Sequence, residues 1–337
     1  MKRTSLWVAI SLTLSLSMMC FVTVPPAEAG EKIVLNLAHI WGPTHLINVE
    51  CQHFAKVVAQ KSNGLVEIKL FPAQQLAKAK ELPEAVSRGT IDMGTIVGPY
   101  IAGKMPLIDV DWLPGLYTWD SVGPAHNEMR PLVDKILGKE LNMKLLFFFF
   151  GGSNELWTVK KPVRKVEDME GLMIRGAGGV LTQIVKVLGA TPVTVSGAEV
   201  YTALQRGTID GCFWGSCSYH SLKAWEVCKY GTKLSNPFGL MFPNVSINLD
   251  RWNELAPETQ KLLLDCVAET ELFCIEAGKK QVTALWEDAE KGGLDIVTMT
   301  PEDEKEWIDT AAEVWGWYVK RAGSVGEELL EIAKKHR

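Results

Sequence analysis

Apolar and polar positions follow the same order in two parts of the chain. Apolar residues alternate with others in Ile33–Ala38, the spacing of a strand with one buried face. Helical spacing of apolar residues follows, and strand and helix patterns then alternate. The first series contains strands at Ile33–Ala38 and Leu65–Phe71 and helices at Glu50–Lys61 and up to Arg88; the second contains strands at Leu172–Arg175 and Thr191–Val195 and helices at Val180–Leu188 and Gly197–Arg206. Each series predicts one α/β lobe with a central sheet flanked by helices.

A short internal repeat closes both series. Glu84–Gly94 and Thr202–Gly211 share Arg-Gly-Thr-Ile-Asp after a helical pattern. Gly89 and Gly207 can end those helices in the left-handed conformation, so a strand is expected after each, at 91–97 and at 209–214. Two related lobes explain the repeat; the alternative is chance recurrence of a short helix-ending phrase.

The remaining apolar segments predict one more strand and a helical C-terminal third. Phe147–Phe150 is a short apolar run that indicates a buried strand. Pro257–Lys279 has helical spacing that continues through Trp286, which predicts a long helix crossing both lobes. Further helices are expected at Glu302–Val319 and Glu327–Lys335.

The N-terminus is typical of an export signal. Lys2 and Arg3 precede the apolar stretch Leu6–Val24, and Ala27 and Ala29 then flank one spacer residue. We expect residues 1–29 to be a signal peptide cleaved after Ala29, which gives a periplasmic protein. The alternatives are an uncleaved membrane anchor and a lipid at Cys20, although bulky Met19 precedes that cysteine.

Composition agrees with a globular protein of two domain-sized units. The 337 residues are 47% hydrophobic and 22% charged, and the formal net charge is −5. There is no basic run, so nucleic acid is not an expected partner. Six cysteines follow the signal segment, and we expect buried thiols, although Cys212 and Cys217 could pair in an exported protein.

Arg175 is the strongest candidate for ligand binding. Ligands of α/β lobes bind beyond the carboxyl ends of the strands, and Arg175 ends one strand. Gly176–Gly179 then lead into a helix, so free backbone N–H groups are expected beside a guanidinium that fits a carboxylate. The alternative is an arginine paired with a surface acid.

Other expected strand ends are rich in aromatic residues, which favours a ligand with an acid group and an apolar or planar body. The further candidates for ligand binding are His39, Trp41, Thr95, Asn154, Gly176, Phe213 and Trp214. No H-E-x-x-H or G-x-S-x-G motif occurs, and no nucleophile stands beside a base, so an enzyme acting on small anions is the weaker alternative.

From about Ile33 to Gly293 the chain resembles the periplasmic solute-binding subunits of TRAP transporters, the family named for dicarboxylate binding. The resemblance rests on Glu170–Arg175, Leu188–Pro192 and Glu199–Gly211. It implies an α/β fold of two lobes joined by hinge strands and a long crossing helix. The expected division is residues 30–153 and 241–281 for lobe I, and 154–240 and 282–337 for lobe II.

The resemblance also implies a function. It implies capture of a small organic acid by Arg175 and delivery to membrane permease subunits driven by an ion gradient, by a monomer or weak dimer. A sensor that presents the ligand to a receptor kinase is the alternative.

Within the family the chain looks nearest the branch that binds 2-oxo acids, which often places a Gln and a Glu-Trp pair near a bound cation. Asn154 stands at the Gln position, and Phe213-Trp214 stands where Glu-Trp would be. Losing that carboxylate argues against a cation, so no cofactor or metal is expected. The additional ring favours an aromatic or hydrophobic monocarboxylate.

Overall fold

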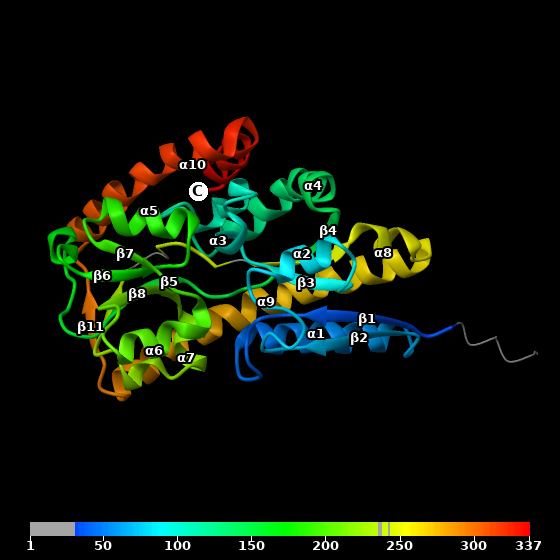
Figure 1. Ribbon diagram of the computed structural model, residues 1–337, viewed down its shortest axis with the longest axis horizontal. Coiled ribbons are helices and arrows are strands. Elements are labelled where there is room, and N and C mark those ends of the chain that lie inside the picture. Colours follow the sequence, from blue (N-terminus) through cyan, green and yellow to red (C-terminus); the bar gives the residue numbers. More distant parts are fainter. Residues whose placement is uncertain (1–30, 235–237, 242) are drawn as a thin grey trace, which may run out of the picture. The chain divides into compact units, whose positions relative to one another are not determined.

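The computed structural model describes residues 31–234, 238–241 and 243–337, and residues 32–337 form one compact unit (Figure 1). The expected signal peptide and its cleavage site after Ala29 lie outside the described residues. Within the described part of the chain, no helix is both long and apolar enough to cross a membrane.

The first sheet has the strand order β2-β1-β3-β10-β4. Strands β1 to β3 run parallel, whereas β10 lies antiparallel between β3 and β4. The strands are β1 (Ile33–Ala38), β2 (Val66–Phe71), β3 (Met93–Ile96), β4 (Met143–Phe148) and β10 (Asn244–Asn248). Helices α1 (Leu46–Lys61), α2 (Leu82–Ser87), α4 (Val122–Leu141) and α8 (Leu249–Glu254) flank it, with α3 (Gly98–Ile101) and the 3-10 helix η1 (Pro106–Trp112) after β3. Leu35 and Leu37 of β1 are fully buried, as its apolar alternation predicts.

The second sheet has the order β11-β9-β5-β8-β6-β7. The strands are β5 (Asn154–Thr158), β6 (Met173–Gly176), β7 (Thr191–Thr194), β8 (Gly211–Gly215), β9 (Tyr230–Lys233) and β11 (Asp295–Thr298). The helical segments are η2 (Val166–Met169), α5 (Gly179–Val187), η3 (Gly197–Glu199), α6 (Val200–Gln205), α7 (Ser216–Ser221) and η4 (Ala224–Glu226). Each sheet with its helices is called a lobe below.

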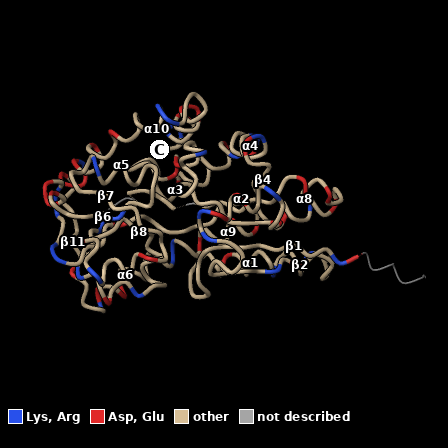
Figure 2. The backbone as a smooth tube through the Cα atoms, viewed as in Figure 1, with Lys and Arg blue, Asp and Glu red and all other residues tan. Residues whose placement is uncertain are grey.

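The chain passes between the lobes after β4 and again before β10. The 35-residue helix α9 (Pro257–Lys291) contacts α1 and β4 of the first lobe and α7 of the second. In Figure 1 it runs from the first lobe to the second, so it is the predicted crossing helix. Helix α10 (Pro301–Lys335) contacts η1, α4 and α5, and acidic and basic residues are interspersed along it (Figure 2). The predicted two-lobed α/β fold is confirmed.

The internal repeat marks equivalent places in the two sheets. Gly89 and Gly207 both have the left-handed backbone expected at a helix end, with φ of 72° and 68°. The aspartate that ends each repeat accepts a backbone hydrogen bond from a neighbouring strand. Asp92 Oδ2 accepts from the Asn36 N–H at 2.8 Å, and Asp210 Oδ2 from the Met173 N–H at 3.0 Å. The repeated phrase therefore ends a helix and ties the next turn to the sheet.

Several predicted elements differ from the observed ones in their bounds. The strand expected at Phe147–Phe150 ends at Phe148, because pairing with β10 ends there; Phe149 instead bonds to the Pro243 carbonyl. The helix expected at Gly197–Arg206 divides into η3 and α6. The C-terminal helices meet at a break at Gly323, where φ is 67°.

The six cysteines of the described residues are buried and unpaired, so Cys212 and Cys217 are not bonded to each other in this structure. They lie in different elements: Cys212 belongs to β8, and Cys217 belongs to α7.

Candidate functional site

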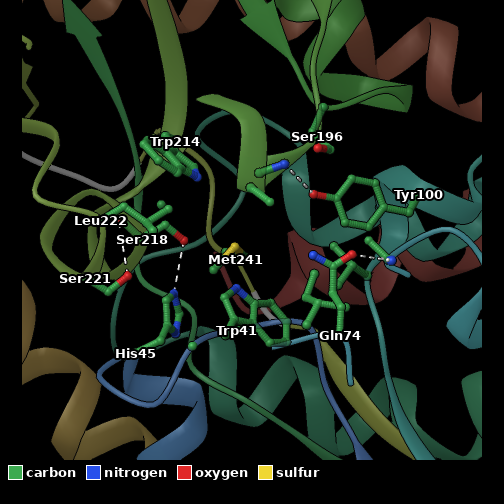
Figure 3. Close-up of a pocket in the computed structure, with 18 of the residues that line it drawn as sticks. Trp41, His45, Gln74, Tyr100, Ser196, Trp214, Ser218, Ser221, Leu222 and Met241 are labelled. Atoms are coloured by element: carbon green, nitrogen blue, oxygen red, sulfur yellow. Dashed lines mark hydrogen bonds between the residues drawn. The ribbon is translucent and has the colours of Figure 1, made fainter. Parts of the chain in front are cut away.

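A cavity of about 260 Å³ is lined by residues of both lobes. The first lobe contributes the segment after β1, the segment after β2 and α3. The second contributes β6, β8, α7 and the residues before η3. Figure 3 shows side chains from these elements pointing toward one space. The cavity therefore lies at carboxyl ends of strands in both sheets, the expected location of a ligand in α/β lobes.

Arg175 of β6 lines this cavity and is only 3% exposed. Its Nε donates to the Val195 carbonyl and its Nη1 to the Phe213 carbonyl, both at 3.0 Å. Among the described residues, no carboxylate pairs with Arg175. The alternative of an arginine paired with a surface acid therefore does not describe this side chain. A buried positive charge that has only carbonyl partners is costly, so the position suits an anionic ligand.

Aromatic side chains form much of the cavity wall. Trp41 lies in the segment after β1 and Trp214 in β8, and Figure 3 shows them on opposite sides of the cavity. Tyr100 of α3 and Trp112 of η1 add to the wall. Two indole rings supplied by different lobes can cover both faces of a planar group.

His45 connects the two lobes at the cavity. It caps α1, where its Nδ1 accepts the Ile47 N–H at 3.1 Å. Its Nε2 lies 3.0 Å from the Ser218 Oγ of α7 (Figure 3). Burial, and then the nearby His39, lower the pKa of His45 to about 3, so its ring is neutral near pH 7.

Arg175 is the one charged side chain among the described residues that line the cavity. The other polar side chains of the lining include no carboxylate or ammonium group: His45, Gln74, Tyr100, Asn154, Ser196, Ser218 and Ser221. In the described part of the chain, no three His, Cys, Asp or Glu side chains are grouped as metal ligands. A lining with one cationic side chain and no acidic one suits a ligand that carries one negative charge.

The structure brings four of the eight predicted ligand-binding residues to the cavity: Arg175, Asn154, Trp41 and Trp214. Phe213 does not line it. Neighbouring side chains of a strand point to opposite faces, so Trp214 faces the cavity while Phe213 stacks on Phe238, with ring centroids 5.2 Å apart. Phe213 contributes only its carbonyl, which holds Arg175.

His39, Thr95 and Gly176 are also absent from the lining. The side chains of His39 and Thr95 are buried, at 1% and 2% exposure. Gly176 packs beneath α5, where an added Cβ would lie 2.8 Å from the Thr182 Oγ1. Each of the three lies within two residues of a residue that lines the cavity, but none of them lines it.

The helix N-terminus after Arg175 serves another purpose than expected. Asp109 of η1, in the first lobe, accepts the Val180 N–H of α5 at 3.1 Å through its Oδ2. Gly179 has a φ of 48°, and a Cβ there would lie 1.8 Å from that oxygen. The glycines thus admit a carboxylate of the protein itself, which occupies the Val180 N–H that was expected to be free for the ligand.

Burial raises the pKa of Asp109 to about 7, whereas the Val180 N–H and Arg321 act to lower it. The carboxyl therefore changes its charge near neutral pH, at a contact between the two lobes.

Sequence reasoning missed several lining residues, including His45, Gln74, Ser196, Ser218 and Met241. Gln74 is held by a backbone φ of 63°, unusual for a residue with a side chain, and it accepts the Ala79 N–H at 3.1 Å. His45 precedes a helical pattern, which identifies an N-cap, but no local pattern predicts its contact with Ser218 of the other lobe.

Comparison with known proteins gives one family. The profile described as bacterial extracellular solute-binding protein, family 7, matches residues 37–321. A C4-dicarboxylate-binding periplasmic protein of Rhodobacter capsulatus is 26% identical over 332 residues, covering 97% of this chain and 95% of the relative. A 2,3-diketo-L-gulonate-binding periplasmic protein of Escherichia coli is 27% identical over 296 residues, covering 84% and 86%.

Solved structures share the fold. An extracytoplasmic solute receptor of Bordetella pertussis that binds pyroglutamic acid has a TM-score of 0.83 at 22% identity, covering 89% of this chain and 99% of the receptor. A TRAP periplasmic solute-binding protein of Desulfovibrio salexigens with bound orotic acid has a TM-score of 0.82 at 24% identity, covering 90% and 98%.

Proposed function

Because the chain belongs to family 7 of the bacterial extracellular solute-binding proteins, we propose that it captures a small organic acid for an ion-gradient-driven TRAP permease. The acid we propose is a monocarboxylate with an aromatic or hydrophobic body. The observation that carries this proposal is the buried Arg175, which has no carboxylate partner in the described residues. A ligand carboxylate would supply that partner in a two-pronged hydrogen-bonded pair.

One carboxylate fits this lining better than two. A second carboxylate would lose its hydration without meeting a second cation, because the other described lining side chains are neutral. The same lining supports binding without a metal cation, and neither Asn154 nor Phe213 supplies a carboxylate for one. This argues for a ligand different from those of the cation-using 2-oxo-acid branch.

The walls support an aromatic or hydrophobic body. Trp41 and Trp214 face the cavity from opposite sides, and Tyr100 and Met241 extend the apolar and aromatic surface. Orotic acid, bound by the Desulfovibrio salexigens protein, is a planar ring with one carboxylate, so a protein of this fold can enclose such a body. Pyroglutamic acid, bound by the Bordetella pertussis receptor, is also a monocarboxylate.

Export to the periplasm belongs to the same proposal. Members of the family are periplasmic, as the Rhodobacter capsulatus relative is, and the N-terminal pattern through Ala29 would direct the chain there. The two lobes would close over the acid, because the cavity takes its walls from both. The closed form would then dock on the permease.

Substitution of Arg175 tests the function. We expect melting shifts with a panel of aromatic monocarboxylates, and we expect Arg175→Ala to lose the shift while remaining folded. Leaving a buried carboxylate without its partner costs about 3–5 kcal/mol, or a loss of affinity of hundreds-fold or more. Arg175→Lys should also weaken binding, since an ammonium cannot form the two-pronged pair.

Titration calorimetry measures the affinities, and Arg206→Ala, which removes an exposed arginine, serves as the control. Equal binding by wild type and Arg175→Ala would show that the acid is held elsewhere. Tight binding of succinate or pyruvate with none of aromatic acids would refute the proposed ligand class.

A further inference from the structure

We infer that His45 and Ser218 form a directed hydrogen-bond relay that offers the ligand a donor, and so selects an acid carrying a second, uncharged acceptor oxygen. The inference rests on the proposed function and narrows its ligand class. His45 lies in the first lobe and Ser218 in the second, and both line the cavity while being only 2% and 4% exposed.

The first step fixes the proton on the His45 ring. A backbone N–H can only donate, and the Ile47 N–H points at the His45 Nδ1 at 3.1 Å. That nitrogen must therefore be unprotonated, and the single proton of the neutral ring lies on Nε2. The lowered pKa of His45 agrees with a neutral ring.

The second step fixes the direction of the bond between the lobes. Because Nε2 carries the proton, it donates to the Ser218 Oγ across 3.0 Å. Ser218 cannot donate back to that nitrogen. A serine hydroxyl has one donor and two acceptor positions, so its own O–H must point elsewhere.

The third step leaves the hydroxyl proton for the ligand. Among the described residues, the Ser218 O–H donates a hydrogen bond to no other group, although Ser218 lines the cavity. The nearby Ser221 has no hydroxyl proton to offer the ligand, because its hydroxyl donates to the Ser218 carbonyl at 3.2 Å (Figure 3). A buried donor without a partner is costly, and a carbonyl or ether oxygen of the ligand would satisfy it.

The acceptor must be uncharged for a separate reason. A second carboxylate would need more than one hydroxyl donor to replace its water, and the described lining has no cation other than Arg175. Arg175 and the relay also stand on different elements, β6 and α7. The site would thus recognise two separate oxygen-bearing groups, an acid at Arg175 and a neutral acceptor at Ser218.

Matched ligands test the relay. The probes are benzoates and phenylacetates carrying an acetyl group at the meta or para position, each compared with its isopropenyl counterpart. The two groups have nearly the same shape, but only acetyl has an acceptor oxygen. In the pair that binds wild type most tightly, we expect the acetyl acid to bind about 3- to 10-fold better by calorimetry, the gain typical of one hydrogen bond.

Two variants assign the preference to the relay. Ser218→Ala should reduce the acetyl-to-isopropenyl ratio to about one. His45→Asn should move the ratio in the same direction, because Asn can still cap α1 but lacks the reach of the Nε2–H. A purely structural role of His45 would weaken both probes equally. Ser324→Ala, which removes an exposed hydroxyl in α10, should keep the wild-type ratio.

The outcomes separate this inference from the proposed function. Equal binding of acetyl and isopropenyl acids by wild type, with binding lost in Arg175→Ala, would overturn the relay and leave the anion site standing. The relay is also overturned if Ser218→Ala keeps the wild-type ratio. Failure of all these acids, and of the wider aromatic panel, to bind wild type would overturn the proposed ligand class and the relay together.

Discussion

Arg175 carries a positive charge into a part of the protein where no described carboxylate balances it. Two backbone carbonyls, from Val195 and Phe213, orient the guanidinium but do not neutralise it. Its place at the end of a strand was predictable from the sequence, because the strand pattern and the glycines after it define that end. The identity of its partners was not, since Phe213 faces away from the cavity and contributes only a main-chain atom.

Trp41 and Trp214 were predictable for the same reason, while His45, Gln74 and Ser218 were not. A tryptophan after a strand is visible in the sequence. The contact of His45 with Ser218 depends on how two lobes approach, and the positive φ of Gln74 follows no local rule for a residue with a side chain.

The two tryptophans should contribute most to binding of a ring. We expect Trp41→Ala and Trp214→Ala each to lower the affinity for an aromatic monocarboxylate by about 5- to 30-fold, the effect of about 1–2 kcal/mol of lost ring contact. Acetate, which has no ring, should bind equally weakly to all three proteins in calorimetry. Trp225→Ala, an exposed position outside the cavity lining, is the control. Unchanged affinities in both variants would mean that the ring lies elsewhere.

At the start of α5, the sequence predicts the turn and the helix but not the group that accepts the Val180 N–H. The sequence predicts a glycine-rich turn and a helix from Val180, and the helix begins at Gly179. The free N–H group at its start meets Asp109, a residue about 70 positions earlier on the other lobe. The helix ends were predictable because Gly89 and Gly207 mark them. Pairing between distant segments was not: β4 ends before its apolar run does, because its pairing with β10 ends there.

Two glycines at the ends of α5 give a matched comparison: Gly179 begins the helix, and Gly189 lies two residues after its last residue, Val187. Gly179 and Gly189 both have positive φ, but an added Cβ meets Asp109 only at Gly179, while Gly189 faces open space. We expect Gly189→Ala to cost about 1 kcal/mol of unfolding free energy from backbone strain. Gly179→Ala should cost about 2–4 kcal/mol, because it also displaces the Asp109 carboxylate from the helix.

Urea denaturation followed by circular dichroism measures both losses. Equal losses at the two positions would show that the contact between Asp109 and α5 contributes no stability.

In the described part of the chain, three hydrogen bonds join the helices and turns of the two lobes near the cavity. They are His45 to Ser218, the Gly197 N–H to the Tyr100 hydroxyl at 3.1 Å, and the Val180 N–H to Asp109. The existence of two sheets and a crossing helix was predictable from the repeat and the helical spacing. The contacts between the lobes were not, because each joins residues that no shared pattern relates.

Tyr100 should hold the lobes together once ligand is bound. Tyr100→Phe removes the acceptor for the Gly197 N–H and keeps the ring in the cavity wall. We expect the affinity for an aromatic acid to fall about 3- to 10-fold, mainly through faster dissociation. Surface plasmon resonance gives the two rate constants. Tyr201→Phe removes a hydroxyl that bonds to Glu226 within the second lobe, so its dissociation rate should match wild type.

Stability should depend on pH through two buried carboxyls. Burial raises the pKa of Asp109 from 3.8 to about 7 and that of Glu155 from 4.5 to about 7. A carboxyl whose pKa is higher in the folded than in the unfolded protein stabilises the folded state fully at pH values below its unfolded pKa. That contribution is lost as the pH rises through about 7, and each pKa unit corresponds to about 1.4 kcal/mol.

The double variant Asp109→Asn/Glu155→Gln should therefore lose less stability than wild type between pH 4 and 8. The difference should amount to about 2–6 kcal/mol across that window. Urea unfolding at several pH values measures it, with Asp295→Asn as an exposed control. Parallel pH profiles for wild type and the double variant would contradict the raised pKa values.

The position of β10 has a consequence for the order of folding. This strand joins the first sheet between β3 and β4, although it follows nearly all of the second sheet in the chain. Until Asn244–Asn248 has been synthesised, β4 has no strand beside it, and β3 lacks its neighbour on that side. Such long-range pairing slows folding. The nascent chain therefore cannot complete the core of its first lobe before this strand has been made, even though most of the second lobe has already been synthesised.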